Sequence, residues 1–138
     1  MGQLAIVYAT LTRNSKKIAE AMEKTLGVKA ENVSTSPVLG EVDLLYIVGG
    51  IYGGKSLPSL MKFVKTLDPA RVKRAVLVTS CARKQRQDGV RMLLQEKGIE
   101  VLEEILCPGS FLFLSYGHPN EGDIQRTADS AARLAEMG

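Results

Sequence analysis

The sequence predicts an α/β protein with a doubly wound parallel sheet and helices on both faces. Apolar runs alternate along the chain with segments of helical periodicity, which is the order of a βαβ fold. The apolar runs are near-continuous instead of alternating with polar residues, as expected for strands buried on both faces. The chain has 138 residues, 45% of them apolar, so we expect one domain, residues 1–138, with its own core.

The clearest strand signals are short apolar runs. We expect strands at residues 4–9, 29–33, 43–48, 74–80 and 99–106. Residues 111–116 are either a further short segment or an extension of the last strand. Only nine residues, 34–42, separate the second and third strands. A parallel crossover usually needs about a dozen residues or more, so we expect a loop there with at most one helical turn.

Between these strands, apolar residues recur three or four positions apart, which is the spacing of one helix face. The expected buried stripes are Ile18, Met22 and Leu26; Leu60, Phe63, Val64 and Leu67; Val90, Leu93 and Leu94; and Ile124, Ala128, Ala131 and Ala135. Gly27 and Gly98 stand where the first and third helices should end. Asn120 is the expected N-cap of the last helix, with Asp123 three positions further on.

The loop after the first expected strand carries a ligand signal. In open α/β sheets, ligands bind beyond the C-terminal ends of the strands. This loop directly precedes a helix and consists of Thr10, Leu11, Thr12, Arg13, Asn14 and Ser15. A helix N-terminus presents unpaired N–H groups and a partial positive charge, and three hydroxyls and one amide add further hydrogen-bonding groups. A simple N-cap needs only one such residue, so the loop favours a phosphate monoester.

The loop resembles the phosphate loop of the flavodoxin family, Thr/Ser-x-Thr-x-Asn-Thr/Ser, with Arg13 where that family usually has glycine. Residues 43–52 resemble the family's strand that leads into its isoalloxazine loop. Residues 117–123 resemble a Gly-x-Pro-Asn-Glu-x-Asp run seen in many small flavodoxin-like proteins. The resemblance covers essentially the whole chain, and it implies a flavodoxin-like five-stranded sheet of order 2-1-3-4-5.

The resemblance implies that the chain binds FMN. The first loop would hold the phosphate through its amides and the side chains of Thr10, Thr12, Asn14 and Ser15. A second loop would line the flavin ring, with Tyr52 as its aromatic lid, and it comprises Gly50, Ile51, Tyr52, Gly53 and Gly54. A third loop would meet the pyrimidine edge, and it comprises Thr79, Ser80, Cys81, Ala82 and Arg83. Tyr116 is either a second ring neighbour or a core residue.

The function that this implies is an FMN-binding electron carrier. The alternative is an NAD(P)H-dependent flavin or quinone reductase, because the same fold hosts both. The chain has no long insert to form a substrate shelf, which favours the carrier over a stand-alone enzyme. A flavin-free binding module is a third alternative. The sequence shows no Ser-His-Asp order and no HExxH motif, so we assign no catalytic residue and no metal.

Two patterns in the sequence suggest other chemistry. Residues 49–56 match the Gly-x4-Gly-Lys-Ser phosphate loop of nucleoside triphosphatases. No apolar strand ends in the Asp that would hold magnesium, and we expect the next helix to begin only after Pro58, so we place Lys55 at the rim of the flavin site instead. Cys81 and Cys107 lie 26 positions apart, which fits no CxxC spacing, and we expect buried thiols. A redox role for Cys81 stays open.

The net charge of +3 is unevenly distributed. Residues 61–98 carry 10 basic and 3 acidic side chains, whereas residues 99–138 carry 2 and 7. The cations on the expected site loops are Arg13, Lys55, Arg83 and Lys84. Members of the resembled family are typically acidic, so we expect a less negative potential for the lower one-electron couple of a bound flavin. We also expect an acidic redox partner protein and no nucleic-acid partner.

The remaining expectations concern location and assembly. No apolar run approaches the roughly 18–20 residues of a membrane span. The N-terminal residues lack the pattern of a secretory signal, so we expect a cytoplasmic protein without a membrane partner. We expect a monomer or a weak dimer.

Overall fold

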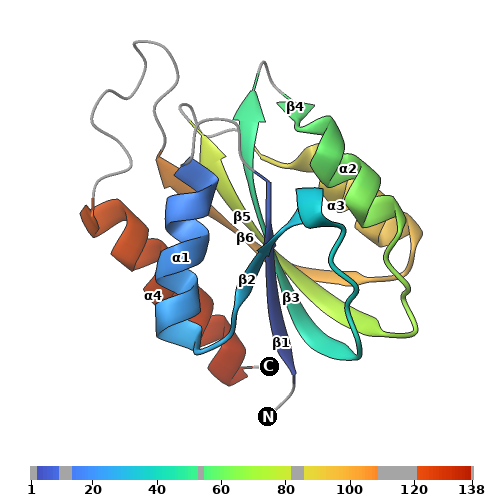
Figure 1. The fold of residues 1–138 in the computed structure, drawn as a ribbon, viewed down its shortest axis with the longest axis horizontal. Helices are drawn as coiled ribbons and strands as arrows, with labels where there is room; N and C mark the ends of the chain where they lie inside the picture. Colours follow the sequence, from blue (N-terminus) through green and yellow to red (C-terminus); the bar gives the residue numbers. More distant parts are fainter. Residues whose placement is uncertain (1–2, 10–13, 53–54, 82–85, 109–120, 138) are drawn as a thin grey trace.

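The structure is a computed structural model that describes residues 3–9, 14–52, 55–81, 86–108 and 121–137. A parallel sheet forms the middle layer, with helices on both faces (Figure 1). Its strands are β1 (Leu4–Tyr8), β2 (Ala30–Asn32), β3 (Val42–Tyr52), β5 (Val72–Cys81) and β6 (Glu100–Pro108). Their order is β2-β1-β3-β5-β6. Counted along the chain as parallel strands, this is the predicted order 2-1-3-4-5.

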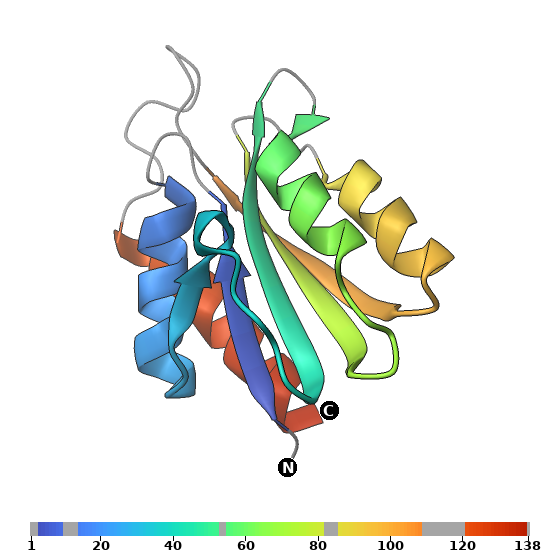
Figure 2. The same cartoon turned by 45° about the vertical axis from the view of Figure 1, so that its right-hand side comes forward.

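The helices pair on opposite faces of the sheet (Figure 2). They are α1 (Asn14–Leu26), α2 (Pro58–Lys65), α3 (Asp88–Glu96) and α4 (Glu121–Met137). Alternate side chains of β3 enter different cores: Tyr46 packs with α1 and α4, whereas Ile47 packs with α2 and α3. Burial on both faces is the physical reason why the strands read as continuous apolar runs.

The predicted helix ends are confirmed by backbone conformation. Gly27 has φ +72° and Gly98 has φ +82°. This left-handed region is costly for residues with a Cβ atom, and it reverses the chain after the last helical turn. The amide of Gly27 donates to the carbonyl of Glu23 at 2.9 Å. None of the helices in the described part of the chain has both the length and the apolar character needed to cross a bilayer.

The connection from β2 to β3 has no full helix, as predicted. A single 3₁₀ turn, η1 (Val33–Thr35), is capped by Asn32, whose side-chain oxygen accepts from the amide of Ser34 at 2.9 Å. The rest of the crossover is irregular up to Val42. Nine residues suffice only for this turn and an extended return to the start of β3.

The expected boundary of the third strand is wrong. Residues 49–52, predicted as a glycine-rich loop, extend β3 to Tyr52. A short strand, β4 (Lys55–Ser56), runs antiparallel to the end of β3 and pairs Ile51 with Ser56 and Tyr52 with Lys55. This pairing supplies backbone partners where the local composition suggests a loop.

Candidate functional site

The C-terminal ends of the parallel strands meet at one edge of the sheet, at the top in Figure 1. At this edge Gly50 of β3 is the ladder partner of Ser80 of β5. The amide of Ala9, which follows β1, donates to the carbonyl of Val48 at 3.0 Å. Helix α1 begins at Asn14, five residues after Ala9. The fold therefore brings the described ends of all three predicted loops to the same edge.

Eight of the predicted contacts lie outside the described residues: Thr10, Leu11, Thr12, Arg13, Gly53, Gly54, Ala82 and Arg83. The expected cap Asn120 and the segment 111–116, which includes Tyr116, also lie outside them. The structure describes the backbone of Asn14, Gly50, Tyr52 and Cys81, and both the backbone and the side chain of Ser15, Ile51 and Ser80.

Ser15 has a buried hydroxyl that lacks a partner among the described residues. The residue is 0% exposed, it lies in the first turn of α1, and its Oγ makes no hydrogen bond to any residue that the structure describes. A buried hydroxyl without a partner costs on the order of 1–3 kcal/mol. An anion bound at this helix N-terminus would accept from the Ser15 Oγ and from the first amides of α1 together. The residues present therefore fit the phosphate of FMN.

The end of β3 has little room on the α2 side. A Cβ atom at Gly49 would lie 2.6 Å from Leu60 Cδ2 of α2 and 3.1 Å from Gln87 Oε1. Gly49 is therefore needed for helix packing. The neighbouring Ile51 is 5% exposed and belongs to the core. In the described part of the glycine-rich run, Gly49 and Ile51 therefore contribute to packing. Ile51 also belongs to the predicted ring-lining segment.

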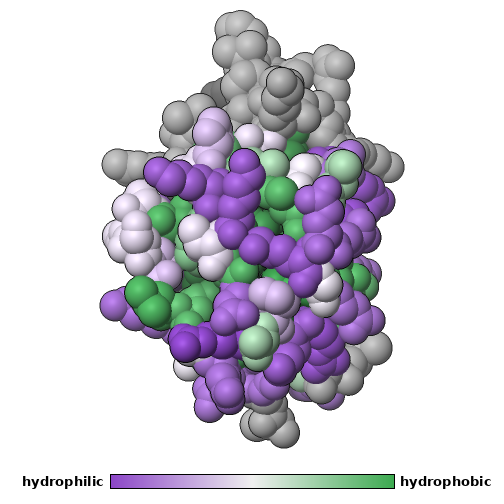
Figure 3. All heavy atoms as spheres, turned by 90° about the vertical axis from the view of Figure 1, so that its right-hand side faces the viewer, coloured by the Kyte–Doolittle hydropathy of each residue, from purple (hydrophilic) through white to green (hydrophobic). Residues whose placement is uncertain are grey.

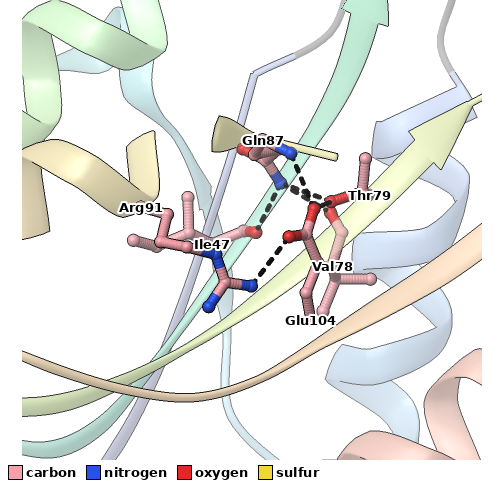
Figure 4. A network of polar contacts seen from close by, with 6 residues as sticks. All are labelled: Ile47, Val78, Thr79, Gln87, Arg91 and Glu104. Carbon is pink, nitrogen blue, oxygen red and sulfur yellow. Dashed lines mark hydrogen bonds and ion pairs between the residues drawn. The ribbon is translucent and has the colours of Figure 1, made fainter. Parts of the chain in front are cut away.

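The end of β5 contains an interaction that sequence reasoning missed. The hydroxyl of Thr79 donates to Glu104 Oε2 of β6 at 2.6 Å, so this predicted loop residue uses its side chain within the core. Glu104 Oε2 also accepts from the amide of Gln87 at 2.7 Å. Glu104 Oε1 pairs with Arg91 Nη2 of α3 at 2.9 Å (Figure 4). The available signal was Glu104 itself, one of three glutamates in the expected strand 99–106.

Cys107 has the predicted environment of a buried thiol. It is 0% exposed, and its Sγ lies 3.8 Å from the carbonyl oxygen of Asp123. Among the residues that the structure describes, no group of three or more His, Cys, Asp or Glu side chains could hold a metal ion.

A separate hollow lies beside α2. Figure 3 views the right-hand side of Figure 1 and shows apolar surface, in green, between polar side chains, in purple. The hollow has a volume of about 600 Å³ and lies between the β2–β3 crossover and α2, where Val33, Leu39, Phe63 and Leu67 line it. None of the predicted flavin contacts that lie within the described ranges lines it.

The comparisons with known proteins agree with this architecture. A family model described as a flavodoxin domain matches residues 5–106. The chain belongs to the flavodoxin family. An uncharacterized protein of Methanocaldococcus jannaschii is 28% identical over 143 residues, which cover 94% of this chain and 95% of the relative.

Solved flavodoxin structures share the fold at low identity. A short-chain flavodoxin associated with a non-canonical PDU bacterial microcompartment has 19% identity and a TM-score of 0.73, covering 98% of each chain. Oxidised flavodoxin 2 from Bacillus cereus has 16% identity and a TM-score of 0.69, covering 99% of each chain. Flavodoxins typically bind a flavin, so membership of this family supports a flavin-binding electron-transfer role.

Proposed function

We propose that this chain is an FMN-binding electron carrier. The observation that carries the proposal is the buried Oγ of Ser15 at the N-terminus of α1, which has no partner within the described part of the chain. This atom lies at the sheet edge where the glycine-rich end of β3 and the end of β5 also meet. A hydroxyl in the first turn of a helix and the first amides of that helix suit a phosphate, and neighbouring strand ends suit a flat ring.

The roles of the residues follow from this arrangement. Ser15 and the first amides of α1 hold the phosphate, together with Thr10, Thr12 and Asn14. Gly50, Ile51, Tyr52, Gly53 and Gly54 line the ring, and Ser80, Cys81, Ala82 and Arg83 meet its pyrimidine edge. When bound, FMN supplies the redox chemistry, whereas the chain binds and orients it and controls its surroundings. Charge supports an acidic redox partner protein, and we place this exchange in the cytoplasm.

The second candidate function is an NAD(P)H-dependent flavin or quinone reductase. The low-identity structural likeness shows the fold alone, and one fold supports both activities. The connections between the described elements are short, and the longest of them, from β6 to α4, spans residues 109–120. This favours the carrier, because a reductase needs a shelf for a second substrate beside the flavin.

The proposal is tested by reconstitution. The purified chain is titrated with FMN and with riboflavin, and binding is followed by quenching of flavin fluorescence. We expect FMN to bind at least about 100-fold more tightly than riboflavin, because several charge-assisted hydrogen bonds depend on the phosphate. Failure to bind FMN would overturn the proposal.

The same preparation separates the two candidate functions. NADH or NADPH is added to the FMN-loaded chain in the absence of any partner protein. An electron carrier leaves the nicotinamide absorbance at 340 nm unchanged and is still reduced by dithionite. Sustained oxidation of either nucleotide would instead support the reductase.

A further inference from the structure

One oxygen of Glu104 joins the two ends of the β5–α3 connection. Glu104 Oε2 accepts from the Thr79 hydroxyl at 2.6 Å and from the Gln87 amide at 2.7 Å. Thr79 lies at the end of β5, and Gln87 directly precedes α3. Both residues are 0% exposed. The two hydrogen bonds therefore set the spacing between the residues where this connection leaves the sheet and where it enters the helix.

The second oxygen of Glu104 is fixed from α3. It pairs with Arg91 Nη2 at 2.9 Å, and the Glu104 side chain is 0% exposed. A buried carboxylate is costly to desolvate, and a well-packed apolar residue is often equally or more stable at such a position. Stability alone is thus a weak reason for a charge here. Geometry is a better one, because a carboxylate with three directed partners permits only a narrow range of positions for each of them.

Gln87 extends this geometry toward β3. Its Nε2 donates to the carbonyls of Val78 at 3.2 Å and Ile47 at 3.4 Å, and to the Thr79 hydroxyl at 3.1 Å (Figure 4). Its Oε1 would lie 3.1 Å from a Cβ atom at Gly49. The residue that ends the connection is therefore held against the strand positions that lead into the predicted ring-lining segment.

We propose that Glu104 is a positioning residue for the flavin site. Acting through Thr79 and Gln87, it holds both ends of the β5–α3 connection at the spacing that places Ser80 and Cys81 against the pyrimidine edge. Ends that are fixed before binding reduce the ordering entropy that flavin binding must overcome. This inference rests on the proposed function, since it takes the ring to lie at this edge of the sheet.

The test uses a matched pair of substitutions at Thr79. Thr79→Val keeps the shape of the side chain but removes the hydroxyl that donates to Glu104, whereas Thr79→Ser retains it. Tyr46→Phe is the control, because it also removes one buried hydroxyl donor but on the opposite face of the sheet, where Tyr46 Oη donates to the carbonyl of Ala131. The thermal midpoints of the variants show how much of any effect is general destabilisation.

Two readouts are expected to separate Thr79→Val from the other variants. The dissociation constants of both FMN and riboflavin should rise about 10-fold, because the ring contact and not the phosphate contact is disturbed. In the flavin-free chain, amide hydrogen exchange in residues 80–87 should be at least about 10-fold faster. Thr79→Ser and Tyr46→Phe should stay within about 2-fold of the original chain in both measurements.

The possible outcomes distinguish this inference from the proposed function. If the original chain binds both flavins and Thr79→Val leaves their affinities unchanged, the positioning role is overturned while the proposed function stands. The same conclusion follows if Thr79→Val and Tyr46→Phe change exchange in residues 80–87 equally. If the original chain binds neither flavin, the proposed function fails and the positioning role fails with it.

Discussion

The hydroxyl of Tyr46 donates a hydrogen bond to the backbone carbonyl of Ala131 at 2.6 Å. The bond joins the middle of β3 to α4 across 85 positions of the chain. Tyr46 is fully buried, and burial raises its pKa from 10.0 to about 12, because the phenolate is poorly solvated there. Packing on the face of the sheet covered by α1 and α4 therefore depends on a residue that ionises at alkaline pH.

The stability of the chain should fall between pH 10 and pH 12. In that window the unfolded chain has lost the Tyr46 proton while the folded chain retains it, so each pH unit favours unfolding by up to about 1.4 kcal/mol. Below pH 10 both states keep the proton, and this contribution to stability is complete. Urea unfolding of the original chain and of Tyr46→Phe from pH 8 to pH 12 isolates the effect. Parallel pH profiles of the two proteins would contradict it.

Gly49→Ala should destabilise the fold. The added Cβ would lie 2.6 Å from Leu60 Cδ2, so α2 must shift or Leu60 must change rotamer, at a cost of about 1–3 kcal/mol. Gly40→Ala is the matched control, because a Cβ at Gly40 meets nothing within 4 Å, and its effect should stay within about 0.5 kcal/mol. Equal effects in chemical denaturation would show that α2 does not pack this closely on β3.

Ser15→Ala should separate binding from stability. The Ser15 Oγ is buried and has no partner among the residues that the structure places, so its removal should leave the flavin-free chain as stable as before or more stable. FMN affinity should fall about 5- to 10-fold, since one hydrogen bond to a charged group is lost. Riboflavin affinity should not change, because riboflavin has no phosphate. If the substitution lowered the affinities for FMN and riboflavin equally, the phosphate would not bind at Ser15.

Lys55→Gln should make the lower one-electron potential of the bound flavin more negative. Lys55 follows the predicted ring-lining segment in β4, and one nearby cation is worth about 1 kcal/mol in a wet site, or roughly 40 mV for one electron. Lys24→Gln removes the same charge from the last turn of α1, about 15 Å along the helix from its first turn, and should change the potential little. Spectroelectrochemical titration of both variants checks the expectation, and equal shifts would argue against it.

Local patterns in the sequence determined most of the architecture. Strands buried on both faces need continuous apolar runs, and helices on a sheet need stripes such as Ile18 and Met22, so both signals are present without knowledge of any distant contact. Gly27 and Gly98 mark helix ends because their φ angles are local properties. The nine-residue gap at 34–42 likewise limited the crossover to one turn, as observed.

Only the tertiary structure determined the backbone pairing and the side-chain partners at the ends of the strands. The extension of β3 to Tyr52 depends on its pairing with β4, and glycine-rich composition by itself indicates a loop. The role of Glu104 depends on Thr79, 25 positions away, and on Gln87, 17 positions away. A sequence shows which residues are apolar or charged. The partner of a buried charge is determined only when separate elements pack together.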